Sequence, residues 1–237
     1  MLLPAGLPRG LVYTLSRSLY VALTNECAAG VSLVASRGPS FAMPTASGFV
    51  PLEREPTAAE VFEAVDYAWA AADSPAPSSG GEAATRLDTF AGRDPADAPF
   101  DEIVFAGLGD PLLQLDVLCD AAALIKGVSW SRQLRVGTRG LVPADQAEAT
   151  LDRLVEAGID RFTINLDAAN PPQYAALVEP HAGAGFSDVC SFVVAAAERG
   201  CLVTAAAVDR PGVDVKQVEA MARGLGCVDF RARPWFP

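Results

Sequence analysis

Short apolar runs that favour β-structure alternate along the chain with longer segments in which apolar residues recur at helical spacing. The first two runs, Leu11–Leu15 and Leu19–Thr24, flank the polar tripeptide Ser16-Arg17-Ser18. This arrangement predicts a β-hairpin whose second arm enters the main sheet as its first strand. A long loop over residues 25–56 is expected to follow this strand.

Later segments repeat the alternation of helix and strand. Thr57 and Glu60 form a capping-box pattern for a helix that ends near Ala72, and Ser187 and Asp214 are expected to cap two later helices. The expected strands cover residues 19–24, 103–107, 134–137, 162–166, 202–208 and 230–233. The expected helices cover residues 57–72, 111–122, 145–157, 187–200 and a segment that begins at 214.

This pattern of six strands and five helices predicts an α/β fold with crossovers long enough to join parallel strands. Residues 73–99 are rich in Ser, Gly and Pro and lack an apolar period, which indicates an insertion in an otherwise single domain over 1–237. Periodicity leaves two architectures open, a doubly wound open sheet and a partial barrel of six strands. In both, functional residues are expected in the loops at the carboxyl ends of the strands.

Composition narrows the range of partners. The chain is 51 % hydrophobic and 20 % charged, as in a soluble globular protein, and its net charge of -11 argues against binding nucleic acid or an anionic membrane surface. No apolar run reaches the roughly 18 residues of a membrane span, so we expect membrane association only peripherally, through partners. The five cysteines form no CxxC pair. Reduced thiols are therefore expected, in the cytoplasm or, after removal of a transit peptide, in an organelle interior.

Four strand-end loops carry the residues that suggest chemistry. They read Thr24-Asn25-Glu26-Cys27, Gly107-Leu-Gly109-Asp110-Pro111, Thr138-Arg139-Gly140 and Asn165-Leu166-Asp167-Ala168. Together with the closing segment Phe230-Arg231-Ala232-Arg233-Pro234, they resemble the radical SAM superfamily, and most closely its short TatD-associated members. The resemblance covers nearly the whole chain, because the motifs occur in the family's order. It favours a partial (β/α)6 TIM-like barrel, with an N-terminal hairpin, over the open sheet.

The loop after the first strand departs from the family. In the family, a CxxxCxxC loop supplies three thiolates to a four-iron cluster whose open iron binds S-adenosylmethionine. Here Cys27 occupies the first ligand position, while Val31 and Val34 occupy the second and third. Soft thiolates hold such clusters, and a valine side chain cannot coordinate iron. The resemblance therefore implies an inherited fold with the cluster and the radical reaction lost, and neither a metal site nor a catalytic residue is expected.

The cofactor pocket of the family is partly retained in the sequence. The family's Gly-Glu-Pro segment bonds the methionine amino group, and the resemblance implies that Asp110 keeps a carboxylate there. Arg139 replaces an asparagine of the family and is expected to alter or fill the pocket, whereas Asn165 and Asp167 keep groups suited to a ribose. The residual cofactor site then consists of Gly107, Gly109, Asp110, Pro111, Thr138, Arg139, Asn165 and Asp167.

Structural explanations of the same residues also stay open. Cys27 fits a small buried residue that follows a strand, and Gly107 and Gly109 fit a tight turn between strand and helix. Arg231 and Arg233 alternate with apolar residues and are expected to face the barrel interior, where they would pair with acids such as Asp110 or Asp167.

The functional hypothesis is a noncatalytic radical-SAM-like pseudoenzyme that serves as a structural or interaction subunit, with protein partners, in a larger assembly. No cofactor is expected in that role. Two alternatives stay open. One is a protein that binds S-adenosylmethionine or another nucleotide in the residual pocket, and the other is a radical SAM enzyme whose iron-sulfur ligands come from elsewhere.

Overall fold

The computed structural model describes residues 3–73, 98–128, 133–181 and 183–237. Within them, seven strands form one sheet in the order β1 to β7. The strands are β1 (Val12–Leu15), β2 (Ser18–Val21), β3 (Glu102–Phe105), β4 (Leu134–Thr138), β5 (Arg161–Asn165), β6 (Leu202–Asp209) and β7 (Asp229–Pro234). The expected insertion over 73–99 lies almost entirely outside the described residues, and the single-domain organisation stays a prediction.

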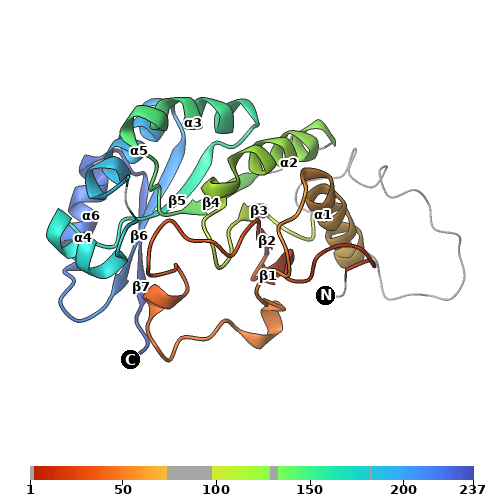
Figure 1. The fold of residues 1–237 in the computed structure, drawn as a ribbon, viewed down its shortest axis with the longest axis horizontal. Coiled ribbons are helices and arrows are strands. Elements are labelled where there is room, and N and C mark those ends of the chain that lie inside the picture. Colours follow the sequence, from red (N-terminus) through yellow and green to blue (C-terminus); the bar gives the residue numbers. More distant parts are fainter. Residues whose placement is uncertain (1–2, 74–97, 129–132, 182) are drawn as a thin grey trace, which may run out of the picture.

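The first two strands form the expected hairpin, in which Leu15 pairs with Ser18 and Ser16 adopts a positive φ of 53° in the turn. Each later strand pairs in parallel with the one before it, from β2 through β7. This sequential order has no reversal of the kind that defines a doubly wound sheet. The sheet curls into a half-barrel, which confirms the partial TIM-like barrel (Figure 1).

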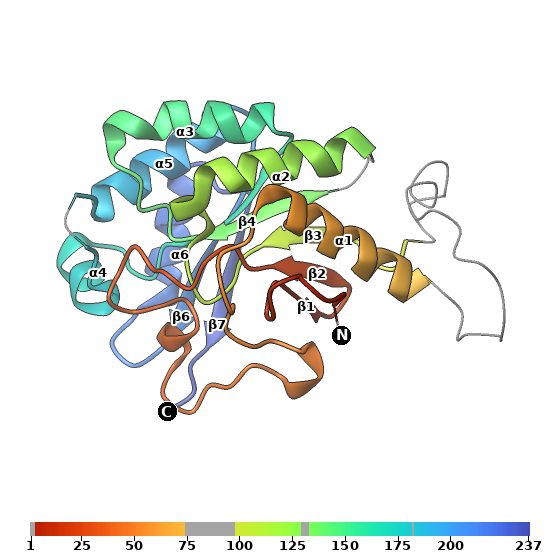
Figure 2. The same ribbon diagram turned by 45° about the vertical axis from the view of Figure 1, so that its right-hand side comes forward.

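Helices lie along the convex side of the sheet, and the segment over 25–56 runs along its opposite, concave side (Figures 1 and 2). The helices are α1 (Ala58–Asp73), α2 (Leu115–Val128), α3 (Ala144–Glu156), α4 (Pro171–Val178), α5 (Phe186–Glu198) and α6 (Val215–Gly224). Short 3-10 turns occur at Ala35–Arg37, Thr45–Ser47 and Pro111–Gln114.

The strands explain this division, because successive side chains point to opposite faces of a sheet. Apolar residues that point toward the helices are almost completely buried, as in Phe105, Val136 and Ile164. The residues between them, such as Arg135 and Thr163, point into the concave side. One face of the sheet thus forms the main hydrophobic core, and the other carries polar groups.

Two expectations about helices were wrong. Helix α4 was not expected, although Asn170 caps it by accepting a hydrogen bond from the backbone N–H of Gln173 and a proline follows at its first turn. Ser187 does not cap α5. Gly185 is the N-cap, and its backbone N–H donates to the Asp188 carboxylate over 2.7 Å, which places Ser187 inside the first turn. The box of Thr57 and Glu60 at α1 is confirmed.

No helix among the described residues is both long and apolar enough to cross a membrane.

Candidate functional site

The loops after β2, β3, β4 and β5 meet at the carboxyl end of the half-barrel, as the parallel topology requires. They bring together the side chains of Asp110, Thr138, Arg139 and Asp167 and the backbone carbonyl of Val31, which we call the strand-end cluster. All four side chains are buried. Four of the eight residues assigned to the residual cofactor site therefore bond directly to one another.

The Asp110 carboxylate accepts hydrogen bonds from three groups of the protein. Its carboxylate oxygens lie 2.7 and 2.8 Å from the Thr138 hydroxyl, and the backbone N–H groups of Arg139 and Leu112 donate to it over 2.9 and 3.1 Å. Burial raises the pKa of this carboxyl, an effect that the surrounding donors and the Arg139 charge oppose. Asp110 therefore ties β4 to the turn at Pro111, where it also acts as an N-cap.

Arg139 spans the cluster. One terminal nitrogen of its guanidinium donates to the Asp167 carboxylate over 2.7 Å, and the other donates to the Val31 carbonyl over 2.7 Å. The two side chains are only 3 % and 6 % exposed. Arg139 thus connects the end of β5 to the backbone at the expected second cluster-ligand position.

The loop that contains Cys27 is held at several points. The backbone N–H groups of Gly30 and Val31 donate to carbonyls of Glu179 and Val178 at the end of α4, over 2.8 and 3.2 Å. The half-buried Cys27 thiol donates to the Leu108 carbonyl over 3.4 Å, and burial raises its pKa, an effect that the Arg139 charge opposes. The geometry is that of a neutral thiol in a loop fixed by backbone hydrogen bonds.

Close approach of two backbones explains Gly109. A Cβ atom at this position would lie 2.3 Å from the Glu26 carbonyl oxygen and 2.6 Å from that of Thr24. The approach is fixed by hydrogen bonds from the N–H groups of Gly109 and Asp110 to those same two carbonyls. A Cβ atom at Gly107 would likewise lie 2.8 Å from the Cβ of Ala22. Loop packing alone therefore requires glycine at these positions.

The donors of this chain do not fit a four-iron cluster. Cys119, Cys190, Cys201 and Cys227 lie on helices or beside strands elsewhere, which leaves Cys27 as the one thiol of its loop. No group of three or more His, Cys, Asp or Glu side chains that would hold a metal occurs within the described residues. Val31 and Val34 offer the loop no side-chain ligand.

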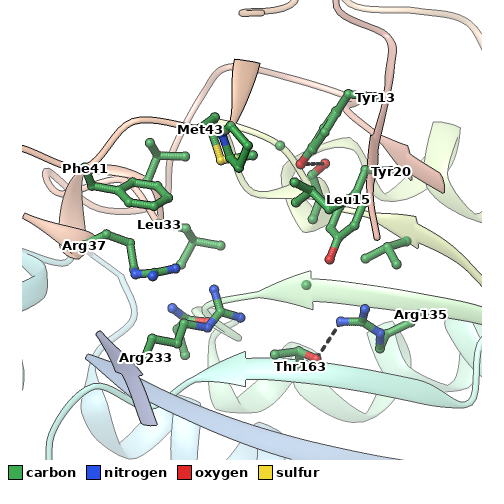
Figure 3. A pocket seen from close by; sticks show the side chains of 17 residues that line it. Tyr13, Leu15, Tyr20, Leu33, Arg37, Phe41, Met43, Arg135, Thr163 and Arg233 are labelled. Carbon is green, nitrogen blue, oxygen red and sulfur yellow. Dashed lines mark hydrogen bonds between the residues drawn. The ribbon is translucent and has the colours of Figure 1, made fainter. Parts of the chain in front are cut away.

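A second feature is a cavity of about 320 Å³ on the concave side, which we call the concave cavity. Its floor consists of residues of the strands and of the turn after β3, and its cover consists of Leu33, Val34, Arg37, Phe41, Met43 and Pro44. Figure 3 shows Leu33, Arg37, Phe41 and Met43 on the covering side. The strands contribute Tyr13, Leu15, Tyr20, Val104, Arg135, Gly137, Thr163, Asn165 and Arg233, and the turn after β3 contributes Ala106 and Gly107. Gly107 and Asn165 are the members of the expected cofactor site that reach it.

The expected pairing of Arg231 and Arg233 with Asp110 or Asp167 was wrong. Asp167 pairs with Arg139, and Arg231 lies 3.7 Å from Asp229 in an exposed ion pair. Arg233 points into the concave cavity instead, beside Arg37 (Figure 3). The Asp110 carboxylate is bonded to Thr138 and to backbone N–H groups, and the ion pair of Asp167 is with Arg139 rather than with the last strand.

Arg37 and Arg135 were not predicted as site residues from the sequence. Arg135 forms an ion pair of 2.6 Å with Glu102 and donates to the Thr163 hydroxyl over 2.8 Å. The alternation of polar residues along β4 and β5 was the available signal for Arg135 and Thr163. Arg37 follows a segment without periodicity, so its place in the cavity had no signal in the sequence.

The parallel strands and the loops at their carboxyl ends define the chain as a partial TIM-like barrel. No family model and no curated protein matches the chain. Several solved structures resemble it over more than nine-tenths of its length, and three of them serve as examples. SuiB of Streptococcus suis bound to the precursor peptide SuiA has a TM-score of 0.58 and 9 % identity, over 95 % of this chain and 40 % of that one. The FeFe-hydrogenase maturase HydG of Carboxydothermus hydrogenoformans has a TM-score of 0.57 and 15 % identity, over 92 % of this chain and 44 % of that one. The radical S-adenosylmethionine methyltransferase TsrM of Kitasatospora setae has a TM-score of 0.53 and 14 % identity, over 91 % of this chain and 34 % of that one.

At these identities the likeness shows the fold. The chain spans less than half the length of these three proteins, at 34 to 44 % of each. The relation to the TatD-associated subgroup stays a prediction.

Proposed function

We propose that the chain is a radical-SAM-like pseudoenzyme, which assembles no four-iron cluster and carries out no radical reaction. The observation that carries the proposal is the state of the loop after β2. Cys27 is its one thiol, and the backbone at Val31 is bonded to the buried guanidinium of Arg139. A cluster bound by three thiolates needs donors at this loop, and Arg139 uses the loop as a hydrogen-bond acceptor instead.

Anaerobic reconstitution with iron and sulfide tests this proposal. The protein is expected to stay colourless and to retain no stoichiometric iron or acid-labile sulfide after desalting. A matched variant, Val31→Cys with Val34→Cys, restores thiols at both missing positions, and adding Arg139→Asn frees the Val31 carbonyl. Uptake of iron by the variants but not by the wild type supports the loss of ligands. A brown wild-type protein with iron and sulfide would contradict it.

Interaction with other proteins is the role we propose for such a fold. It is supported by the edge strand β7, whose residues are mostly exposed and whose outer side pairs with no other strand of the described sheet. An exposed edge offers backbone groups to another chain. Co-purification of a second chain in a fixed ratio from the natural source is expected. A chain that behaves as a free monomer there, at its native concentration, would contradict this role.

Binding of S-adenosylmethionine or another nucleotide is the alternative. It predicts heat on titration with S-adenosylmethionine that is lost in Asp110→Ala. No heat, or equal heat in both proteins, would exclude it.

A further inference from the structure

Three arginines face the concave cavity from different elements. Arg37 comes from the covering segment, Arg135 from β4 and Arg233 from β7 (Figure 3). The whole chain carries a net charge of -11, so this concentration of cations on one cavity runs against its overall balance.

The arginines differ in how they are paired. Arg135 has the bidentate carboxylate of Glu102, at 2.6 and 2.8 Å. Within the described parts of the chain, the Arg37 side chain donates only its Nε, to the Pro234 carbonyl over 3.0 Å, and its guanidinium lies over the ring of Phe41 at 4.5 Å. The side chain of Arg233 has neither a hydrogen bond nor an ion pair with any described residue, although its backbone belongs to the strand that pairs with β6. Two guanidinium groups therefore face each other without a carboxylate between them.

Burial lowers the pKa of Arg233, and the neighbouring charge of Arg37 lowers it further, while the charge of Asp167 opposes the shift. An arginine remains charged at neutral pH nevertheless, because its ordinary pKa lies far above 7. The cavity thus holds two partly desolvated cations that repel each other. An anion placed between them would remove that repulsion and accept hydrogen bonds from both.

Other groups in the cavity fit an organic ligand. The buried Asn165 side chain lines the wall, and its amide nitrogen has no acceptor among the described residues. The hydroxyl of Tyr20 points into the space, and Leu33, Phe41 and Met43 supply an apolar surface (Figure 3). A volume of about 320 Å³ lies at the lower end of the range of small-molecule sites.

We propose that the concave cavity binds a small organic oxyanion, with its carboxylate or phosphate group between Arg37 and Arg233 and its apolar body against Leu33, Phe41 and Met43. Forked guanidinium groups match both kinds of oxyanion. This site is separate from the strand-end cluster and needs no cluster or radical reaction, so it goes beyond the proposed pseudoenzyme and stands or fails independently of it.

Calorimetry with phenyl phosphate, phenylacetate and benzyl alcohol tests the site in the full chain at low salt. The two anions separate phosphate from carboxylate as the source of the charge, and the alcohol tests the apolar body alone. At least one anion is expected to bind, and more tightly than benzyl alcohol. Arg233→Met should weaken that binding by about tenfold to a hundredfold, since it removes charge-assisted hydrogen bonds.

The control is Arg231→Met, which lies two residues away on the same strand, outside the cavity, and should bind like the wild type. Absence of binding by both anions, or equal binding by Arg233→Met, would overturn the proposal.

A measurement on the wild type covers the case in which Arg233→Met does not fold. Phenylglyoxal modifies arginine side chains, and the modified positions can be read by mass spectrometry. The anion that binds should protect Arg37 and Arg233 but not Arg231. Equal modification with and without both anions would overturn the proposal.

Discussion

Arg139 and Arg233 both contribute a guanidinium group to the half-barrel, but among the described residues only the Arg139 guanidinium has bonded partners. Arg139, at the strand ends, bonds to Asp167 and to the Val31 carbonyl. Arg233, in the concave cavity, faces another arginine (Figure 3). A buried charge that is bonded to protein groups holds the surrounding backbone in place, whereas a buried charge without partners is costly unless something else binds it. The strand-end cluster is thus a site closed by ion pairing among its own residues, whereas the concave cavity is a site open to a ligand.

The largest effect is expected when the buried ion pair of Arg139 and Asp167 is broken. Asp167→Asn keeps the shape of the side chain and tolerates its positive φ of 57°, but it removes the carboxylate to which the buried Arg139 guanidinium is directly bonded. We expect the free energy of unfolding, measured by urea denaturation, to fall by about 3–5 kcal/mol. Asp229→Asn removes an ion pair whose side chains are 53–54 % exposed and should cost less than about 1 kcal/mol. Equal costs would show that burial of the pair is unimportant.

Gly109→Ala tests the close approach of the loops that builds the strand-end cluster. The added Cβ would meet the Glu26 carbonyl at 2.3 Å, so we expect a loss of roughly 1–3 kcal/mol in the same assay. Gly127→Ala in α2 has nothing within 4 Å of the new Cβ and should gain about 0.5–1 kcal/mol from helix propensity. A neutral Gly109→Ala would mean that the loops separate easily.

A smaller effect on the free energy of unfolding is expected at Glu102, the carboxylate that pairs with Arg135 of the concave cavity. Burial raises the pKa of Glu102, but hydrogen bonds and charge from Arg135 outweigh it and hold the pKa below its ordinary 4.5. A lowered folded-state pKa gives stability that is present above the ordinary value and lost as the pH falls through the folded value. As the pH falls from about 6 to about 3, the wild type should therefore lose more unfolding free energy than Glu102→Gln.

Glu219→Gln, which removes an exposed ion pair with Arg223 on α6, is the control and should follow the wild type over the same range. Parallel pH profiles for Glu102→Gln and the wild type would contradict the role of Arg135.

Most of the fold was predictable because it depends on local pattern. Apolar runs predicted the strands, and the capping box of Thr57 and Glu60 predicted a helix start that the structure confirms. Helix α4 was missed although Asn170-Pro171 carries a helix-start signal, because only eight residues follow before the helix ends.

The pairing of charges was not predictable. The sequence contains several arginines that could pair with Asp167. Only their positions in the folded structure show that the partner is Arg139 rather than Arg231 or Arg233. The meeting of Arg37 with Arg233 depends on how a loop without periodicity crosses the sheet, which no local pattern encodes.

The most direct test compares the unfolding free energies of Arg139→Met and Arg233→Met, each measured by urea denaturation without added ligand. Methionine keeps much of the apolar stem and removes the charge in both. Arg139→Met is expected to lose about 3–5 kcal/mol, because Asp167 becomes a buried charge without a partner. Arg233→Met should change by less than about 1 kcal/mol, since it breaks no hydrogen bond within the described protein. Equal losses, or a larger loss at Arg233, would contradict the distinction between the closed site and the open one.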